Sequence, residues 1–386
     1  MHLSEILTHL GEDHEKYFGA TAPPVIQTSN FVFKSVAEFR SAIQHEFDEH
    51  IYTRGNNPTV KMLREKLAAL EETEDALVFP SGAAATAMAV LSLMKSGEHI
   101  ICIEKPYSWT RTLVAEILPR FGISYSFVDG TDTEAIRQAV QPNTTFMYLE
   151  SPNSMTFELQ DLAACAAIAK ENGIATLIDN TNCTPLFQKP ANLGIDLVMH
   201  TGTKYLNGHS DVVCGVICGS RKNIEKIFHA GYMTFGNIIS PHDAWLIMRG
   251  LRTFELRVKR SYESALKISQ WLEKQPKVRQ VLFPMLPSFP QYELAKKQMK
   301  GCAGLVSFYL DTESVERVEA FTDKLERFLL AVSWGGHESL VMPMAAFYNM
   351  PGKENPPLPP NLVRIYVGLE DPDYLIEDLE QALAVM

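Results

Sequence analysis

The sequence predicts an α/β fold with a mostly parallel, doubly wound sheet, followed by a smaller C-terminal α/β domain. Short apolar runs typical of buried strands alternate with helical patterns from about residue 75 to residue 220, the arrangement that produces parallel sheets. Several of these runs end directly at polar or glycine-containing turns, where such sheets bind their ligands. A chain of 386 residues is also long enough for more than one domain.

Composition and charge limit the classes of partner. The hydrophobic content is 46% and the charged content is 21%, values typical of globular proteins. A net charge of -11 argues against nucleic acid or an anionic membrane as a partner. No apolar run is long enough to span a bilayer, and the first residues lack the basic segment and apolar core of a signal peptide. We therefore expect a cytoplasmic protein with no nucleic-acid or membrane partner.

The six cysteines do not indicate a metal site. None belongs to a Cys-x-x-Cys pair, and the spacing of Cys214 and Cys218 is a poor match to zinc-binding motifs. We interpret all six as buried apolar residues in a reducing compartment, and we expect no bound metal.

Residues 1–56 are expected to form an N-terminal arm with little core of its own. This region carries few long periodic segments and contains an extended Ala-Pro-Pro-Val-Ile-Gln stretch. Near its end, Tyr52 and Arg54 place an aromatic ring and a cation in a turn-rich sequence. The arm could pack on a neighbouring subunit or remain a solvated loop, and its own sequence favours neither.

A helix, a strand and a glycine turn come next. Leucines recur at helical spacing over residues 59–72, and residues 76–79 form a short strand pattern. Gly82 and Ala83 then open an alanine-rich helix. Such a strand–turn–helix arrangement points free backbone N–H groups at a phosphate. Many helices begin in the same way, so this signal is weak when taken alone.

Two further strand patterns end beside side chains suited to a flat cofactor. Residues 99–103 lead to Tyr107, an aromatic ring that can stack on a planar ligand. Residues 146–150 lead to Asn153, whose amide can hydrogen-bond a phenolic oxygen. Each residue has a plainer alternative, since Tyr107 could fill the core and Pro-Asn-Ser is ordinary turn chemistry.

An acid and a lysine at strand ends indicate a particular cofactor. Asp179 ends a buried-type strand, and Lys204 lies between apolar segments, where partial desolvation would lower the pKa of its ammonium. A neutral amine can form a Schiff base. Pyridoxal 5'-phosphate needs such a lysine for its aldehyde and an acid beside its pyridine nitrogen. Thr201 and Thr203 can face one anion. The alternative is a lysine that snorkels from a strand end.

The C-terminal part is expected to form a second domain. Residues 244–274 read as one long helical region with a break near Gly250, and strand patterns follow at residues 305–310 and 363–368. We divide the chain into an arm (1–56), a pyridoxal-phosphate-binding domain (57–250) and a C-terminal domain (251–386).

Taken together, these stretches resemble the Cys/Met-metabolism family of pyridoxal-phosphate enzymes, the trans-sulfuration enzymes, which have the type I aminotransferase-like fold. The resemblance covers most of the chain, from about Tyr52 to Glu370. Its most specific motif is Thr-Lys-Tyr-x-x-Gly-His-Ser-Asp at residues 203–211, combined with the upstream Asp-Asn-Thr at residues 179–181.

The resemblance implies roles for the matching residues. Lys204 would bond to the cofactor aldehyde, Asp179 would contact the pyridine nitrogen, and Tyr107 would stack on the ring. Together with Tyr52, these residues form the expected catalytic set. Arg364 would bind the substrate α-carboxylate, as a guanidinium can with two hydrogen bonds; the alternative is a surface pair with an acid.

The same resemblance implies the rest of the site and the assembly. Cofactor contacts are expected from Gly82, Ala83, Thr201, Thr203, Asn153, Tyr52 and Arg54, and substrate contacts from Ser333 and Trp334 as well as Arg364. Tyr52 and Arg54 would reach the phosphate of the adjacent subunit. The expected assembly is therefore a homodimer with shared sites that pairs into a tetramer.

Within the family, the sequence resembles the cystathionine β-lyase branch most closely. Ser-Trp-Gly-Gly-His-Glu-Ser-Leu at residues 333–340 is similar to that branch's Ser-Trp-Gly-Gly-Tyr-Glu-Ser-Leu. We expect β-elimination of cystathionine to homocysteine, pyruvate and ammonia, as in methionine biosynthesis. Asn153, which the γ-enzymes share, leaves cystathionine γ-synthase and methionine or cystathionine γ-lyase as alternatives. A non-catalytic cofactor-binding regulator is disfavoured, because no basic helix-turn-helix segment is appended.

Overall fold

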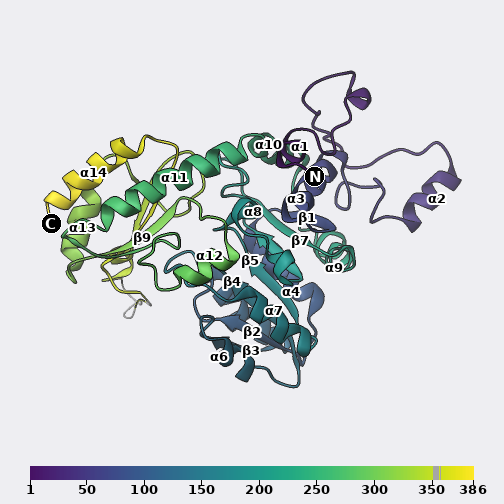
Figure 1. Ribbon diagram of the computed structural model, residues 1–386. Coiled ribbons are helices and arrows are strands. Elements are labelled where there is room, and N and C mark those ends of the chain that lie inside the picture. The colour runs from purple at the N-terminus through teal and green to yellow at the C-terminus, as the bar shows by residue number, and fades with distance from the viewer. Residues whose placement is uncertain (351–355, 357) are drawn as a thin grey trace.

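The computed structural model describes residues 1–350, 356 and 358–386, which form two β-sheets with helices packed around them (Figure 1). The larger sheet lies in the middle of the molecule, and the smaller sheet lies beside it, close to the C-terminus. An N-terminal arm extends from the opposite side and carries α2 (Val36–Gln44) at its outer end. The predicted arm and the smaller C-terminal α/β region are therefore both present.

The larger sheet has seven strands. Their spatial order is β1 (Asp75–Phe79), β7 (Gly215–Gly219), β6 (Leu197–His200), β5 (Ala175–Asp179), β4 (Thr144–Glu150), β2 (His99–Ile103) and β3 (Ser124–Val128). Strand β7 runs antiparallel to both of its neighbours, and the other pairs are parallel. The predicted mostly parallel sheet is confirmed. Its parallel strands end at one edge, where Glu150, Asp179 and His200 are the last residues of three adjacent strands.

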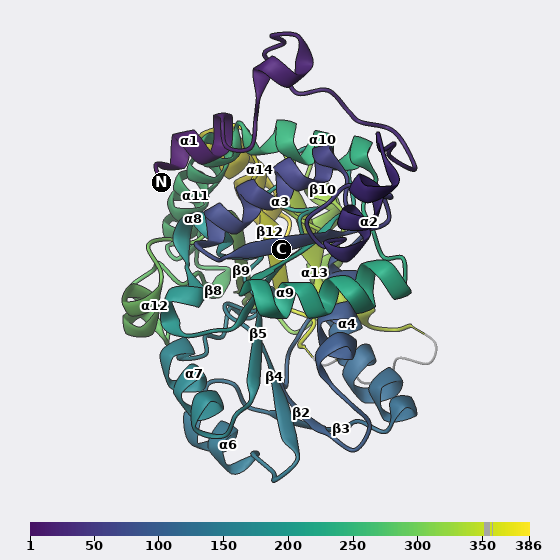
Figure 2. The same ribbon diagram turned by 90° about the vertical axis from the view of Figure 1, so that its right-hand side faces the viewer.

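Both faces of this sheet are buried. Ala76 and Val78 of β1 belong to one apolar cluster, whereas Leu77 and Phe79 of the same strand belong to another, as the alternation of side chains along a strand requires. Helices supply the other half of each cluster (Figure 2). They are α3 (Pro58–Glu71), α4 (Gly82–Leu93), α6 (Thr133–Gln138), α7 (Leu162–Glu171), α8 (Thr184–Phe187) and α9 (Arg221–Ile227). The short helix α5 (Ser108–Thr112) follows β2.

The smaller sheet has five strands. Their order is β10 (Leu329–Leu330), β11 (Leu340–Pro343), β12 (Leu362–Tyr366), β9 (Leu305–Leu310) and β8 (Val278–Leu282). The accompanying helices are α11 (Phe254–Leu272), α12 (Tyr292–Gln298), α13 (Val315–Lys324) and α14 (Pro372–Ala384). The central strand β12 carries Arg364, so this sheet delivers one of the predicted site residues.

The long helical region predicted between the two sheets is broken, as expected, close to Gly250. Helix α10 (Pro241–Leu251) ends there and α11 begins at Phe254. A Cβ atom at Gly250 would lie 2.2 Å from the Asn207 carbonyl oxygen, so a glycine is needed for this close approach. The Gly250 carbonyl accepts a hydrogen bond of 2.8 Å from Arg257, which satisfies it outside the helix. The predicted domain boundaries themselves stay a prediction.

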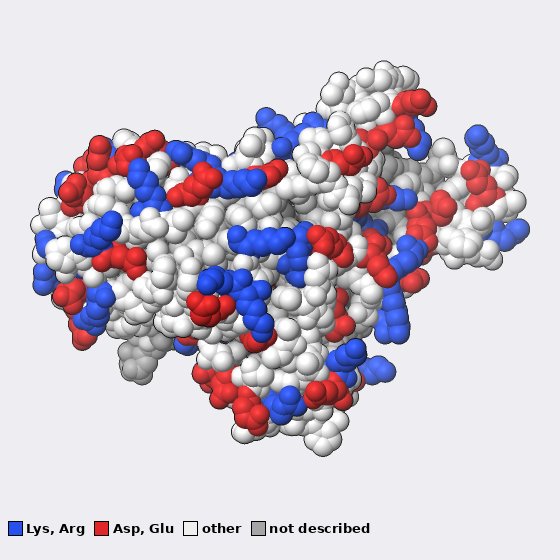
Figure 3. Space-filling model, viewed as in Figure 1, with Lys and Arg blue, Asp and Glu red and all other residues white. Residues whose placement is uncertain are grey.

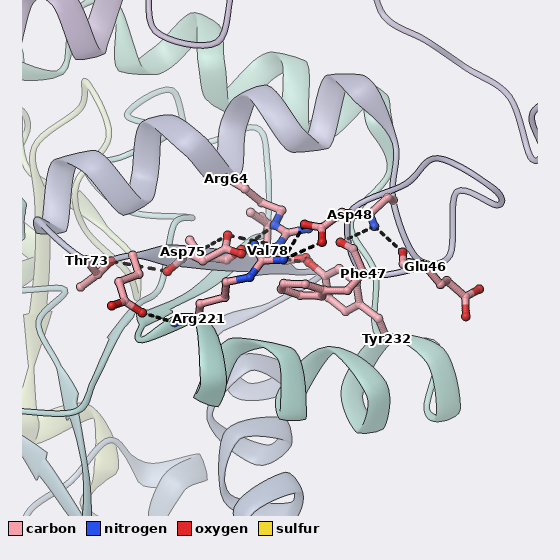
Figure 4. Close-up of polar contacts among 12 residues, drawn as sticks. Glu46, Phe47, Asp48, Arg64, Thr73, Asp75, Val78, Arg221 and Tyr232 are labelled. Carbon is pink, nitrogen blue, oxygen red and sulfur yellow. Dashed lines mark hydrogen bonds and ion pairs between the residues drawn. The ribbon is translucent and has the colours of Figure 1, made fainter. Parts of the chain in front are cut away.

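Both ends of the arm contact α3, the helix that packs on β1 of the larger sheet. At the start, α1 (Leu3–Thr8) packs on α3, and Lys66 of α3 pairs with Glu12 at 3.2 Å in a buried position. At the other end, the chain is held by the Arg64 cluster, which consists of the buried Arg64 side chain, Asn56 and Phe47 (Figure 4). Arg64 donates to the Asn56 side chain at 2.7 Å, and Asn56 donates to the Phe47 carbonyl at 2.8 Å. The segment that carries Tyr52 and Arg54 is therefore fixed in place.

Acidic and basic side chains are interspersed over the face shown in Figure 3. Such mixing gives no broad basic surface there that would suit a nucleic-acid backbone. Within the described residues, no helix is both long enough and apolar enough to cross a membrane.

Candidate active site

Lys204 lies in the turn after β6, at the edge where the parallel strands end. Its amine donates a hydrogen bond of 2.5 Å to the Ser333 hydroxyl and lies 4.5 Å from the centre of the Trp334 ring. Burial, and secondarily the charge of Arg364, lowers the pKa of Lys204 to about 8, while the Asp179 carboxylate opposes this shift. An appreciable fraction of the amine is therefore neutral near pH 7, the form that attacks an aldehyde or accepts a proton.

Arg364 is buried beside this lysine. Its guanidinium donates to the Ser154 carbonyl at 3.0 Å and to the Ser333 carbonyl at 3.5 Å, and it lies 4.9 Å from the centre of the Trp334 ring. Burial lowers the pKa of Arg364 to about 10, so the side chain remains a cation at neutral pH. The alternative of a surface ion pair is wrong, because Arg364 is only 4% exposed and Glu370 binds the loop before β11 instead.

Asp179 is the last residue of β5 and is buried. Its Oδ1 atom accepts the Thr181 N–H at 2.9 Å and the Thr181 hydroxyl. Burial raises the pKa of Asp179, whereas the bonds from Thr181 and the charges of His200 and Lys204 lower it. Because both hydrogen bonds found in the described part of the chain go to Oδ1, Oδ2 is left to accept one from a ligand.

A buried polar network lies behind Asp179. His200, at the end of β6, bonds through Nε2 to the Glu71 carboxylate of α3. The same carboxylate accepts the Asn180 side chain at 3.0 Å, and the Asn180 oxygen accepts Gln188 at 2.9 Å. These bonds fix the residues on either side of Asp179 and Thr201. The network thus holds the ends of β5 and β6 in register.

The N-terminus of α4 provides an anion cradle. The Ser81 hydroxyl caps the helix by accepting the Ala84 N–H at 3.0 Å, and the N–H groups of Gly82 and Ala83 have no partner within the helix. A Cβ atom at Gly82 would lie 2.2 Å from the Thr201 hydroxyl. The absence of a side chain at Gly82 therefore allows Thr201 to stand directly beside these free N–H groups, as a phosphate site requires.

Two other predicted cofactor contacts are engaged elsewhere. The Thr203 hydroxyl accepts the Cys214 N–H at 2.9 Å and donates to the Cys214 carbonyl at 3.2 Å. The Asn153 side-chain oxygen accepts the N–H groups of residues 155–157, the shortest bond being 2.8 Å to Thr156. The turn chemistry considered for Asn153 is therefore present. A contact of either residue with a cofactor stays a prediction.

The aromatic residues divide into one at the site and one in the arm. Tyr107 is 44% exposed at the start of α5, and burial together with the Asp179 and Glu150 charges raises the pKa of its phenol. It therefore lies close to Asp179. Tyr52 is 46% exposed, with the Arg54 guanidinium 5.6 Å from its ring centre. The part that Tyr52 and Arg54 play in a neighbouring subunit stays a prediction.

Two buried residues of the site are missed by sequence reasoning. Glu150 ends β4 next to Asp179 in the parallel register and accepts the Tyr107 N–H at 2.7 Å. His200 ends β6 and binds the network behind Asp179. Both are polar residues that close buried-type strand patterns. A polar residue at the end of an apolar strand pattern is visible in the sequence. This pattern alone does not distinguish a site residue from one that only ends a strand.

The residues present fit pyridoxal 5'-phosphate. A lysine with a lowered pKa, a buried acid with a free oxygen and an anion cradle with no side chain at Gly82 lie at one edge of the sheet. Lys204 could hold the aldehyde carbon, Asp179 the pyridine nitrogen and the N-terminus of α4 the phosphate.

Comparisons with known proteins agree with this chemistry. The chain is 37% identical over 382 residues to an L-methionine gamma-lyase of Treponema denticola, covering 97% of this chain and 95% of the relative. It is 36% identical over 390 residues to an L-alanine/L-glutamate racemase of Wolbachia pipientis wMel, covering 98% and 96%. A crystal structure of metB from Corynebacterium glutamicum superimposes with a TM-score of 0.91 at 32% identity, covering 100% of this chain and 98% of that one.

The family model for Cys/Met metabolism PLP-dependent enzymes matches residues 4–384. This match extends over the arm, both sheets and every residue of the site described above. The likeness to the metB structure agrees with the type I fold predicted from the sequence. The chain therefore belongs to the Cys/Met-metabolism family of pyridoxal-phosphate-dependent enzymes, and pyridoxal 5'-phosphate is its cofactor.

Proposed function

We propose that this pyridoxal-phosphate-dependent lyase cleaves the β-carbon–sulfur bond of cystathionine. The overall reaction consumes water and releases homocysteine, pyruvate and ammonia. The observation that carries the proposal is that the centre of the Trp334 ring lies 4.5 Å from the Lys204 amine and 4.9 Å from the Arg364 guanidinium. A base, an apolar wall and a carboxylate anchor are the protein groups that such an elimination requires.

Each side chain of the site has a separate role in the proposed reaction. When bound, pyridoxal 5'-phosphate supplies an electron sink for the bond broken at the α-carbon. The neutral Lys204 amine removes the α-proton, since its pKa of about 8 suits a base at physiological pH. Arg364 holds the carboxylate, and the Trp334 ring excludes water beside it. Asp179 keeps negative charge next to the pyridine nitrogen.

The number of bases favours β-elimination over γ-elimination. Departure of a thiol from the β-carbon needs one proton removed, at the α-carbon. Departure from the γ-carbon needs a second proton removed, at the β-carbon. Lys204 has a pKa lowered to about 8, whereas the pKa of the Tyr107 phenol is raised. The site thus offers one amine suited to proton removal near pH 7, which is sufficient for β-chemistry.

The second candidate is γ-elimination or γ-replacement, as in methionine γ-lyase, cystathionine γ-lyase or cystathionine γ-synthase. It is favoured by the relative from Treponema denticola, which is an L-methionine gamma-lyase. A single lysine that serves both carbons in turn would meet the need for a second base. Product identity therefore separates the two candidates.

The deciding experiment incubates the purified holoenzyme with cystathionine and identifies the oxo acid. Pyruvate with homocysteine supports β-elimination, and 2-oxobutyrate with cysteine supports γ-elimination. A parallel incubation with L-alanine, followed by chiral analysis, tests the racemisation named for the Wolbachia relative. Lys204→Ala protein is the control for turnover at this site. A holoenzyme that forms no product from cystathionine contradicts the proposed β-elimination.

We also propose that the active unit is a homodimer in which Tyr52 and Arg54 complete the partner's phosphate site, with two dimers forming a tetramer. Both side chains are exposed and lie on a segment fixed by the Arg64 cluster. A cation presented on a rigid segment suits a second phosphate contact. Light scattering of the purified protein tests the assembly. We further propose that the chain divides into domains after residues 56 and 250. A cytoplasmic location is also proposed.

A further inference from the structure

Glu150 connects two loops that carry opposite sides of the site. The residue ends β4 and is 5% exposed. Its Oε2 atom accepts the N–H of Tyr107 at 2.7 Å, and its Oε1 atom accepts the N–H of Ser154 at 3.1 Å. Tyr107 lies after β2 and Ser154 after β4. One carboxyl group therefore ties together the loops at the ends of two adjacent strands.

Ser154 extends this connection to Arg364. Its carbonyl accepts the Arg364 guanidinium at 3.0 Å, while its N–H is held by Glu150. Three hydrogen bonds thus run in series from the Tyr107 backbone to the guanidinium of β12. This is a physical link from the larger sheet to the smaller one, and it passes through the middle of the site.

The surroundings of Glu150 make its position well defined. Glu150 and Asp179 are register partners on neighbouring parallel strands, so their side chains project to the same face of the sheet. Burial, followed by the Asp179 charge, raises the pKa of Glu150. The backbone N–H of Glu150 also donates to the Gln160 side chain at 3.1 Å. The carboxyl group is therefore enclosed and anchored from several directions.

We propose that Glu150 is a positioning residue that sets the spacing between the Tyr107 ring and the Arg364 guanidinium, and thereby the affinity for the substrate carboxylate. It acts through the Tyr107 and Ser154 backbones and does not itself touch the substrate. The inference rests on the proposed function for the roles of Tyr107 and Arg364. It goes beyond that function by assigning a task to a carboxyl group behind both of them.

The competing explanation is that Glu150 merely satisfies buried backbone donors. The chain offers a matched control for that role. Asp378 in α14 is 2% exposed, and its carboxylate accepts the backbone N–H groups of Glu326, Arg327 and Phe328 at 2.8–3.3 Å. None of these residues belongs to the site. Asp378→Asn therefore removes a comparable buried carboxylate without disturbing either loop.

The experiment compares Glu150→Gln with Asp378→Asn. In Glu150→Gln, the new amide NH2 must face either the Tyr107 or the Ser154 N–H, so one of the two bonds is lost. Glycine is the probe, because it has the amino acid carboxylate but no leaving group. Its dissociation constant is read from the absorbance of the bound cofactor, alongside the melting temperature. We expect Glu150→Gln to weaken glycine binding by about tenfold, the size of one lost hydrogen bond.

A double-mutant cycle with Arg364→Lys identifies the path of the effect. If Glu150 acts through Ser154 on the guanidinium, Glu150→Gln should change glycine binding by less than about threefold once Arg364 is replaced. Full additivity of the two substitutions would overturn the inference. So would a Glu150→Gln protein that loses thermal stability to the same degree as Asp378→Asn but binds glycine normally.

These outcomes are separable from those of the proposed function. Glycine binding is measured whether or not the enzyme forms pyruvate. A holoenzyme that gives no elimination product but shows the expected coupling would refute the lyase proposal and leave the role of Glu150 standing. The reverse result, turnover of cystathionine with additive substitutions, would refute the role of Glu150 alone.

Discussion

The amine of Lys204 donates a 2.5 Å hydrogen bond to the hydroxyl of Ser333, although 129 residues separate the two in the sequence. Lys204 follows a strand of the larger sheet, and Ser333 lies between two strands of the smaller one. Ser333 has a φ of +85°, a strained conformation for a residue with a side chain. The base is thus oriented by a strained loop from the other sheet, which places the reaction centre at their junction.

The first prediction concerns the site of cofactor attachment. Borohydride reduction of the holoenzyme should fix the cofactor on Lys204, because its lowered pKa makes it the amine best suited to an aldehyde at neutral pH. Lys204→Ala should yield no adduct and no turnover. Peptide mapping by mass spectrometry is the measurement. Lys189→Ala, which alters another partly buried lysine, should keep the adduct at Lys204. A cofactor adduct on any other lysine would contradict the assignment.

The second prediction concerns the charge that Arg364 places beside Lys204. Removing this cation in Arg364→Met should raise the pKa of Lys204 above its value of about 8, because the ammonium loses a repulsive neighbour. The measurement is the pH dependence of acylation of Lys204 in the cofactor-free protein. Arg260→Met, which alters an exposed cation, should leave the midpoint unchanged. An unshifted midpoint in Arg364→Met would show that burial alone sets the pKa.

The same shift predicts a pH dependence of stability. The pKa of Lys204 is lowered from 10.5 to about 8, so the unfolded chain binds more protons than the native one between these values. The contribution of Lys204 to the free energy of unfolding should therefore rise with pH across this window and be lost as the pH falls through about 8. Urea unfolding of the cofactor-free protein, compared with Lys204→Met, isolates this contribution as a difference in slope.

Much of the fold follows from local patterns, and so does part of the site. Strand patterns that end at Asp179 and close before Lys204 place both residues at one edge of a parallel sheet. The start of α4 is equally visible, because Ser81 and Gly82 carry a recognisable cap and turn. These features depend on neighbours in the sequence, which is why the sequence alone is sufficient to predict them.

The remaining features depend on partners distant in the chain. The hydrogen bonds between the Thr203 hydroxyl and the Cys214 backbone are one example, because Cys214 lies eleven positions further along the chain. Glu150 reads as the end of a strand, because its task is defined by Tyr107 and by Ser154 across a loop. The hydrophobic periodicity of a sequence does not predict which hydrogen bonds a polar side chain makes in the folded protein.

A further prediction is that Arg364→Lys lowers kcat/KM for cystathionine by on the order of 10²-fold, since a lysine cannot reproduce two parallel hydrogen bonds to a carboxylate. The buried position of Arg364 against the Trp334 ring leaves little room for water to substitute. Steady-state kinetics provide the measurement, with Arg260→Lys as an exposed control. A loss smaller than about threefold would remove Arg364 from the carboxylate site.

Another prediction tests the shared site. Arg54→Ala and Lys204→Ala proteins should each be inactive or nearly so. Mixed dimers of the two should regain activity, because one of the two sites then has both a native Lys204 and a native Arg54 from its partner. Differently tagged subunits allow the hybrids to be purified before assay. Confirmed hybrids without restored activity would show that Arg54 serves its own subunit or no site at all.

The last prediction concerns the close approach of Gly82 to Thr201. A Cβ atom at position 82 would lie 2.2 Å from the Thr201 hydroxyl and 3.0 Å from its Cβ atom, so Gly82→Ala must push this side chain away from the free N–H groups of α4. We expect the affinity for pyridoxal 5'-phosphate to fall by at least about tenfold, as for the loss of a hydrogen bond to a charged group. Equilibrium dialysis of the cofactor-free protein measures this change.

Replacement of Thr201 separates the steric clash at position 82 from the loss of the Thr201 hydroxyl as a phosphate ligand. In Gly82→Ala/Thr201→Ala, the hydroxyl that would clash is absent, so the melting temperature should recover most of what Gly82→Ala alone loses. Cofactor affinity should remain low, because the hydroxyl is a ligand as well as an obstacle. Thr201→Ala by itself should weaken binding with little change in stability. If the double variant regained full affinity, Thr201 would be only a steric neighbour of the cradle, and the phosphate would be held by the backbone of α4 and its other contacts.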